Sequence, residues 1–87
     1  IRPPGHHSGF KNQPHGFSFF NNVAIGANYF VSRTKKNAVI IDWDIHHGEG
    51  TQNIFYTRND VLYISLHRFD NGKFFPHIKQ SSSEYVG

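Results

Sequence analysis

Side chains that can ligate a metal ion follow directly on one apolar run of the chain. The run is Ala38 to Ile41, and Asp42, Asp44 and His46 come after it at every second position. Successive side chains of a strand point to opposite faces, so these three groups are expected to point the same way. Carboxylate and imidazole groups at the end of a strand suit zinc or a similar divalent ion, and ligands of α/β sheets gather at the carboxyl ends of strands. The pattern predicts a divalent-metal site at this point.

A simpler alternative is that Asp44 and His46 pair with each other at the start of a loop, with no ion between them. Against it, residues 42 to 47 contain two acids and two histidines, the second histidine being His47. Without a cation these groups would repel one another or stay unpaired. The metal interpretation is therefore favoured.

A second pair of imidazoles, His6 and His7, lies in the opening segment. Residues 1–18 hold three of the four prolines, which predicts a loop. Paired loop histidines can be metal ligands, can act as general acid and base, or can have no special role, because an imidazole titrates near neutrality wherever it lies. The pair gains weight only from the metal-type cluster downstream.

The surrounding segments predict alternating helices and strands. Apolar residues at helical spacing indicate a helix over 20–34, namely Phe20, Val23, Ala24, Ala27 and Val31, which Asn37 can close. A strand is expected over 38–44, a turn at 48–50, a short helix over 51–56 with Thr51 as its cap, and a second strand over 61–66. This order favours an α/β fold with a crossover connection and a parallel sheet. Phe74 and Phe75 follow the second strand and either line a pocket or cover the edge of the core.

Length and composition limit the classes of protein. The chain has 87 residues, a net charge of +3, no cysteine and no methionine. Neither a disulfide framework nor a cysteine zinc site is possible, and no apolar run approaches the roughly 20 residues that span a bilayer. The tightest cationic cluster, Arg33, Lys35 and Lys36, fits a solvated helix end, so we expect no direct nucleic-acid partner and no membrane partner. We expect the chain to be an internal fragment of a larger protein.

Four motifs in this sequence resemble those of the zinc-dependent histone deacetylases. They are RPPGHH at 2–7, GFSFFNNVAIGA at 16–27, DWDIHHGEGTQ at 42–52 and LYISLHRFDNGKFFP at 62–76. Together they span nearly the whole chain in the order of the family, and they are most similar to class II, nearest the first catalytic domain of the class IIb enzymes. The resemblance implies an arginase/deacetylase-type parallel-sheet fold. Residues 1–87 would be a partial αβαβ fragment of one three-layer deacetylase catalytic domain.

The resemblance also implies a role for each matching residue. It makes Asp44 and His46 zinc ligands, with a third ligand, an aspartate, beyond the end of the chain. It makes His7 the general base and His6 its electrostatic partner, oriented by Asp42 and Glu49. A channel for the acyl-lysine side chain is implied at Gly16, Phe17 and Phe75. A structural potassium ion is implied at Asp42, Asp44, His46, Ser65 and Leu66, and a second one at the main chain of Phe55, Arg58 and Val61.

The implied reaction is hydrolysis of the acetyl amide of N6-acetyl-lysine in histones or cytoplasmic proteins, with Zn²⁺ as cofactor and K⁺ as a structural ion. The family also uses an oxyanion tyrosine, which lies outside these residues, so this segment alone is expected to be inactive. Corepressor complexes are possible partners, and the expected location is intracellular, in the nucleus, the cytoplasm or both. The sequence departs from the family pattern at Glu49, where Asp, Asn or Gln is usual, and at Ser18, where cysteine is usual.

Two other functions compete with this interpretation. A binuclear ureohydrolase or a related acylpolyamine hydrolase would share the fold, but ureohydrolases carry another aspartate two residues after the histidine, where this chain has Gly48. A catalytically silent scaffold would keep the fold for partner binding. Zinc content and acetyl-lysine turnover distinguish the scaffold from the enzyme.

Overall fold

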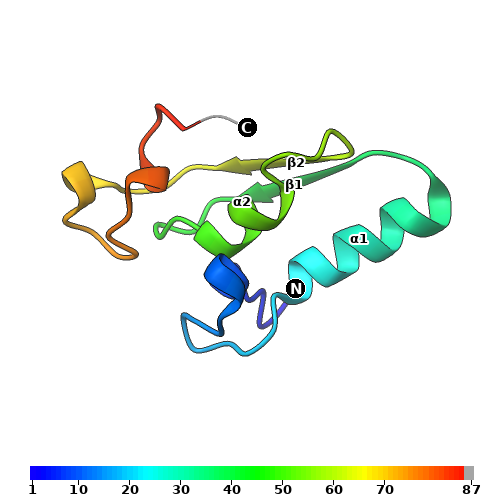
Figure 1. Cartoon of the computed structure of the whole chain (residues 1–87), viewed down its shortest axis with the longest axis horizontal. Coiled ribbons are helices and arrows are strands. Elements are labelled where there is room, and N and C mark those ends of the chain that lie inside the picture. Colours follow the sequence, from blue (N-terminus) through cyan, green and yellow to red (C-terminus); the bar gives the residue numbers. More distant parts are fainter. Residues whose placement is uncertain (86–87) are drawn as a thin grey trace.

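Two parallel strands joined by a helix form the centre of the structure (Figure 1), a computed structural model that describes residues 1–85. The elements are α1 (Asn22–Thr34), β1 (Ala38–Asp42), α2 (Glu49–Phe55) and β2 (Val61–Ser65), with short 3-10 turns at Phe10–Asn12, Asp70–Gly72 and Lys79–Ser81. The strands pair in parallel, from Ala38 opposite Val61 to Asp42 opposite Ser65. The expected α/β order and the parallel crossover are confirmed.

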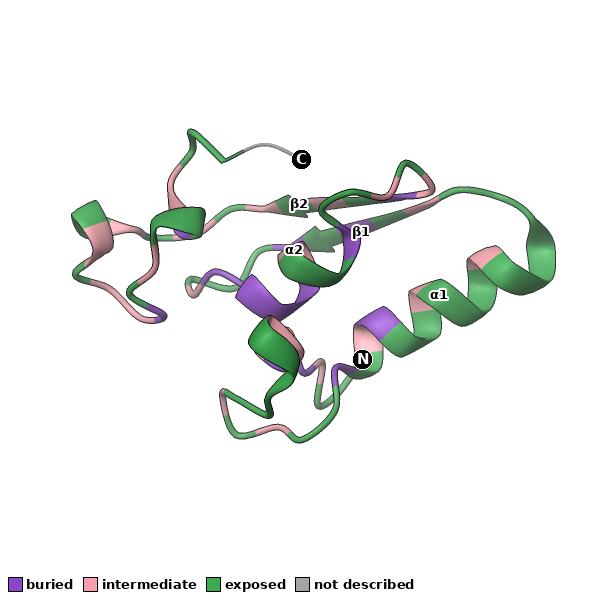
Figure 2. Ribbon diagram, viewed as in Figure 1, coloured by how far each residue is buried: buried purple, intermediate pink, exposed green. Residues whose placement is uncertain are grey.

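Both helices pack on the same face of the sheet. The buried core is made of one residue from each main element, Ala24, Ile40, Phe55 and Val61. Five partly buried residues pack against it, namely Val23, Ala27, Val31, Ala38 and Tyr63. Figure 2 shows that buried residues concentrate where α2 and the opening loop meet the strands. This small core fixes the end of β1 relative to the start of α2, and the candidate site lies there.

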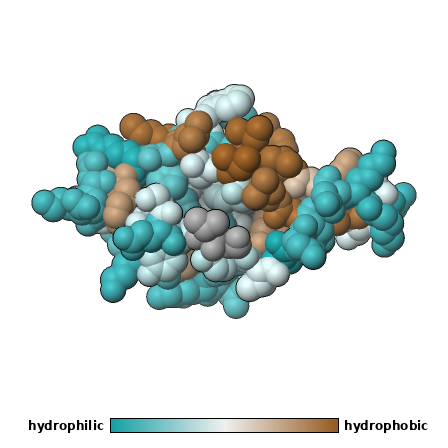
Figure 3. All heavy atoms as spheres, turned by 90° about the horizontal axis from the view of Figure 1, so that it is seen from above, coloured by the Kyte–Doolittle hydropathy of each residue, from teal (hydrophilic) through white to brown (hydrophobic). Residues whose placement is uncertain are grey.

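The opposite face of the sheet is apolar and bare. Val39 and Ile41 of β1 are each 59% exposed, and Leu62 and Ile64 of β2 are 57% and 40% exposed. Ile40 and Asp42, which alternate with them in β1, are buried and Ala38 is partly buried, so the strand pattern has the expected period of two. Figure 3 shows hydrophobic side chains gathered over the part of the molecule that contains the strands. A parallel sheet is normally covered on both faces, and here one cover is missing.

The expected bounds of the first helix and of the first strand were partly wrong. α1 begins at Asn22 because the side chain of Asn21 accepts a hydrogen bond from Ala24 N at 3.0 Å, and Phe20, expected on its core face, is 70% exposed before the helix. Lys35 closes the helix in a left-handed conformation instead of Asn37. β1 ends at Asp42, two residues earlier than expected. Asp44 and His46 therefore lie in a bend after the strand, and strand alternation does not fix their direction.

The second helix also begins earlier than the sequence suggested. α2 starts at Glu49 with Gly48 as its cap residue, so residues 48–50 do not form a separate turn and Thr51 is not a cap. Thr51 is fully buried, and its hydroxyl forms hydrogen bonds with His6 and Asn21 of the opening segment instead. None of the helices in residues 1–85 is long and apolar enough to cross a bilayer.

Candidate functional site

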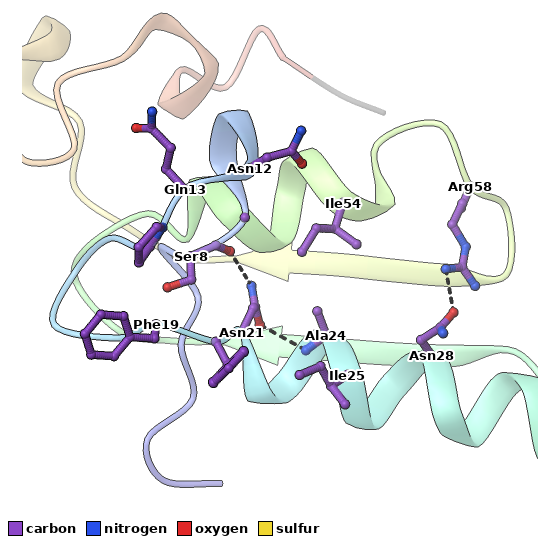
Figure 4. Close-up of a pocket in the computed structure, with 13 residues that line it drawn as sticks. Ser8, Asn12, Gln13, Phe19, Asn21, Ala24, Ile25, Asn28, Ile54 and Arg58 are labelled. Carbon is purple, nitrogen blue, oxygen red and sulfur yellow. Dashed lines mark hydrogen bonds between the residues drawn. The ribbon is translucent and has the colours of Figure 1, made fainter.

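The opening loop is fastened to the start of α2 by buried polar contacts. The Asn21 amide donates to the carbonyl of Ser8 at 3.1 Å and to the Thr51 hydroxyl at 2.8 Å (Figure 4), and the Thr51 N–H donates to the carbonyl of His6 at 3.0 Å. At Gly50, a Cβ would lie 2.0 Å from the Ser8 carbonyl oxygen. The loop thus lies directly against the helix backbone, and this contact sets the position of His6 and His7.

His7 is held by a buried carboxylate. Its Nδ1 lies 2.6 Å from Oε2 of Glu49, and the Glu49 side chain is only 1% exposed. Oε1 of Glu49 lies 2.7 Å from Nδ1 of His15. Burial raises the pKa of Glu49, but the hydrogen bonds from the two imidazoles, a backbone hydrogen bond at Glu49 and the charge of His7 together outweigh burial and leave this pKa below its ordinary value. Glu49 is therefore ionised at neutral pH and can hold both imidazoles.

His6 lies in a different environment. A hydrogen bond of 2.7 Å links its Nδ1 to the Thr51 hydroxyl, and its Nε2 lies 3.8 Å from Oδ2 of Asp42. Burial lowers the pKa of His6, and the Asp42 charge only partly opposes this. His6 is therefore neutral at pH 7. The two neighbouring histidines thus have distinct partners, which are Thr51 and the nearby Asp42 for His6 and Glu49 for His7.

Asp44 and His46 lie side by side and more exposed. Oδ2 of Asp44 accepts a hydrogen bond from the His46 N–H at 2.8 Å and lies 3.3 Å from Nδ1 of His46. The His46 ring stacks on Phe74 with centroids 4.8 Å apart, and its centroid lies 6.4 Å from that of His7. The bend after β1 therefore brings both predicted ligands close to the predicted base.

These two donors fit one edge of a zinc coordination sphere. Zinc bonds of roughly 2.0–2.1 Å to nitrogen and oxygen in a tetrahedron place neighbouring donors about 3.3 Å apart, which matches the separation of the Asp44 and His46 donor atoms. Catalytic zinc sites use three protein ligands. Within residues 1–85 no group of three or more acidic, histidine or cysteine side chains is arranged to hold a metal ion. The described residues supply no third donor beside Asp44 and His46, and the role of this pair as metal ligands stays a prediction.

Two of the three predicted channel residues contact His7. The Phe75 and His7 rings pack edge to face with their centroids 4.9 Å apart, and a Cβ at Gly16 would lie 2.4 Å from Cδ2 of His7. Phe17 points fully into solvent and has a left-handed backbone with φ of 65°. The structure brings Gly16 and Phe75 to the site and leaves Phe17 outside it, and the channel role of all three stays a prediction.

The residues predicted for the first potassium site gather at the end of the two strands. The Asp42 carboxylate accepts hydrogen bonds from the Tyr63 hydroxyl at 2.7 Å and from Asp44 N at 3.1 Å, and the Asp42 carbonyl accepts from Leu66 N at 3.0 Å. The Ser65 hydroxyl shares a hydrogen bond of 2.7 Å with Nδ1 of His67. Their role as potassium ligands stays a prediction.

The second predicted potassium set lies in the turn between α2 and β2. The Phe55 carbonyl accepts from Arg58 N at 3.1 Å, the Arg58 guanidinium pairs with Asp60 at 2.7 Å, and Val61 begins β2. The three residues are neighbours in space, as a shared ion would require. Nothing else in the described residues assigns them an ion.

Sequence reasoning missed three polar residues of the site. His15 bonds Glu49, Tyr63 bonds Asp42, and His47 is fully buried with its Nδ1 2.8 Å from the Ser81 hydroxyl. Burial and the neighbouring His67 lower the pKa of His47 to about 4, so it is neutral. Tyr63 had a signal in the sequence, because it follows Val61 at the strand period and so faces the core, and His47 was noted only as part of the crowded segment 42–47. The contacts of His15 and His47 join segments far apart in the chain.

One cavity lies away from these residues. It has a volume of about 570 Å³ between the opening loop, α1 and α2 (Figure 4). Its lining is mostly apolar or amide, and Arg58 is its one ionisable side chain. It does not include His7, Glu49 or the Asp44–His46 pair, so it is not the candidate reaction site.

Comparison with known proteins gives one consistent family. The Histone deacetylase domain model matches residues 1–87. Histone deacetylase HDA1 of Candida albicans is 51% identical over all of this chain and 11% of its own length, and Histone deacetylase clr3 of Schizosaccharomyces pombe is 47% identical over all of this chain and 13% of its own. The crystal structure of the HDA15 HD domain superposes with a TM-score of 0.89 at 45% identity, over all of this chain and 24% of that one.

The parallel α/β segment, with Asp44 and His46 beside paired histidines, has the fold of the matched deacetylase structure. The chain belongs to the histone deacetylase family. It spans about a tenth of the length of the two curated relatives named above.

Proposed function

We propose that the protein hydrolyses the acetyl amide of N6-acetyl-lysine in other proteins, with zinc as cofactor. The observation that carries the proposal is the placement of His7. Its Nδ1 is bound to the buried Glu49 at 2.6 Å, while its ring lies 6.4 Å from that of His46, which adjoins Asp44. A base held by a carboxylate next to a metal-ligand pair is the arrangement that metal-assisted amide hydrolysis needs.

The residues have separate tasks in this reaction. Asp44 and His46 hold the zinc ion, which when bound polarises the amide carbonyl and lowers the pKa of water. His7 accepts the proton of the attacking water at Nε2, because Glu49 holds the other nitrogen, Nδ1, in its protonated form. His6, neutral and close to Asp42, stabilises charge that develops beside His7. A protonated imidazole then delivers a proton to the lysine amine as it leaves.

The aromatic residues at the site suit an acylated lysine. Phe74 and Phe75 pack against His46 and His7, and an apolar wall accepts a lysine stem once acetylation has removed its charge. Because relatives carry the name histone deacetylase, acetylated histones and cytoplasmic proteins are the proposed substrates, in the nucleus or the cytoplasm. Corepressor complexes are proposed as partners on the same basis.

We also propose that residues 1–87 form part of a single larger catalytic domain. The bare apolar face of Val39, Ile41, Leu62 and Ile64 needs a covering layer, and the zinc site needs a third ligand. The proposed potassium ions would bind at the end of the strands, around Asp42 and Ser65, and in the turn after α2. They would be structural, because oxygen ligands there would tie β1 to β2.

Turnover and metal content of the full-length protein test the proposal. We expect stoichiometric zinc and hydrolysis of an acetyl-lysine peptide. His46→Ala should remove zinc and turnover together, because His46 is a ligand. His7→Ala should retain zinc and lower kcat by roughly 100-fold or more, the scale of losing a general base.

The other functions give different results. Zinc without turnover in the wild type would favour a silent scaffold. Hydrolysis of a guanidino substrate or of acetylated polyamines, without action on the peptide, would favour the related hydrolases. Zinc retained in His46→Ala, or an unaltered rate in His7→Ala, would contradict the roles given to these residues.

A further inference from the structure

We propose that His15 is a positioning residue for the general base, acting on His7 through the carboxylate of Glu49. This inference rests on the proposed deacetylase function and adds a residue to it. The three side chains form a chain in space, in which the two oxygens of Glu49 bind one imidazole each, at 2.6 Å to His7 and at 2.7 Å to His15. His15 itself contacts neither Asp44 nor His46 in any hydrogen bond or ion pair that the structure shows within residues 1–85.

Both oxygens of Glu49 need a donor because the side chain is 1% exposed. A buried carboxylate oxygen without a partner is costly, and the usual result is protonation or rotation of the group. His7 can serve only one oxygen in this geometry, so His15 serves the other. The hydrogen bonds of both imidazoles, with a smaller contribution from a backbone hydrogen bond at Glu49, favour the ionised carboxylate despite its burial.

The ionised state of Glu49 decides which nitrogen of His7 is free. An ionised carboxylate accepts only, so Nδ1 of His7 must carry a proton. Nε2 is then the unprotonated nitrogen and is available as a base. If Glu49 were protonated or turned away, this tautomer would lose its support, and a smaller share of the protein would have a competent base.

His15 is placed for this task by its own backbone. Its N–H donates to the Ser18 carbonyl at 3.1 Å, and its carbonyl accepts from Ser18 N at 3.2 Å and from the Ser8 hydroxyl at 3.2 Å. The Phe75 ring meets both His7, at 4.9 Å, and His15, at 5.2 Å between centroids. The imidazole is thus fixed at its backbone and packed on one side, with 48% of its side chain exposed.

The inference also explains why glutamate can stand at position 49. A glutamate bridges two imidazoles here, and an aspartate, one methylene shorter on the same backbone, would reach at most one of them. The contribution of His15 should therefore depend on Glu49. This coupling separates a positioning role from a general effect of His15 on the fold.

The test is a double-mutant cycle in the zinc-loaded full-length protein, with His15→Leu, Glu49→Asp and the double variant. We expect His15→Leu to retain zinc and to lower kcat about 10-fold, at the low end of the effect of lost supporting hydrogen bonds, with KM unchanged within about twofold. In the Glu49→Asp background the same change should alter kcat by less than about twofold. His15→Asn, which keeps an N–H donor near the position of Nδ1, should restore most of the rate.

His77→Leu is the matched control. This histidine also meets Phe75, at 6.2 Å between ring centroids, but its Nδ1 bonds the Gly72 carbonyl and not Glu49. It should leave kcat unchanged. The proposal would be overturned if His15→Leu left kcat unaltered or changed only KM. It would also be overturned if His15→Leu lowered kcat as much in the Glu49→Asp background as in the wild type, or if His15→Asn lowered kcat as much as His15→Leu.

A second measurement does not depend on turnover or on the folding of a variant. Nitrogen-15 NMR of the wild-type protein should show both His7 and His15 protonated at Nδ1 with downfield Nδ1 protons. Nδ1 of His15 without a proton would overturn the positioning role. If the wild type shows this NMR pattern but does not hydrolyse the peptide, the proposed function fails while the hydrogen-bonded bridge stands.

Discussion

Replacing Gly50 with alanine tests whether the contact between the opening loop and α2 sets the position of the base. A Cβ at Gly50 would lie 2.0 Å from the Ser8 carbonyl oxygen and 2.8 Å from the carbonyl carbon of His7. Both are backbone atoms and cannot turn aside as a side chain would. Gly26, in the middle of α1, has nothing within 4 Å of its Cβ position and provides a matched control.

The magnitude follows from these distances. Real Cβ atoms essentially never approach within 3.0 Å, so the loop at Ser8 must move by about 1 Å or more in Gly50→Ala. Overpacking of this kind costs roughly 1–3 kcal/mol, and the better helix propensity of alanine returns up to about 1 kcal/mol. We expect a net loss of stability of about 1–2 kcal/mol. Gly26→Ala should instead stabilise by about 0.5–1 kcal/mol.

Activity should change more than stability. The moved segment carries His7, and a misplacement of about 1 Å at a reacting group can lower a rate about 100-fold. The assays are urea unfolding and peptide deacetylation by the full-length protein under conditions where the variant is folded. If Gly50→Ala were as stable and as active as Gly26→Ala, the loop would not be held against α2 in this way.

Three more changes test the remaining polar contacts, each in the full-length protein. Asn21→Ala removes a helix cap and two buried hydrogen bonds, so urea unfolding should show that the free energy of unfolding falls by about 2–3 kcal/mol. The control Asn22→Ala loses one exposed hydrogen bond and should lower this free energy by under about 1 kcal/mol. Equal losses in the two variants would contradict the role of Asn21. Tyr63→Phe removes the hydroxyl that donates to Oδ2 of the buried Asp42 at 2.7 Å, so thermal melts should show a loss of stability of about 1–3 kcal/mol. An unchanged melting temperature would show that this hydrogen bond does not stabilise the fold. The pKa of Glu49 is lower in the folded than in the unfolded state, so its stabilising contribution is present above its ordinary pKa of 4.5 and is lost as the pH falls through the folded value. Glu49→Gln should therefore flatten the acid limb of the stability profile, and an identical limb in that variant would contradict the shift.

The layered arrangement was predictable because its signals are local. Apolar runs with a period of two and of 3.6 residues indicated two strands and a helix, and the parallel pairing followed from their order. The ends of elements were less predictable, because they depend on single contacts. The side chain of Asn21 caps α1 and also joins Ser8 and Thr51, which belong to distant segments.

The candidate site was predictable where ligand-type residues crowd one segment, as Asp42, Asp44 and His46 do. Strand alternation was nevertheless the wrong reason for the proximity of Asp44 and His46, since both lie beyond β1 and a bend brings them together. His15 gave no signal, because its link to Glu49 spans 34 positions and arises only when the opening loop docks on α2.

The position of bound zinc in the full-length protein tests the central claim most directly. Anomalous X-ray diffraction at the zinc edge should place one ion about 2.0–2.2 Å from a carboxylate oxygen of Asp44 and from a ring nitrogen of His46, with His7 nearby but not bound to it. Zinc found away from this pair, or coordinated by His7, would contradict the account.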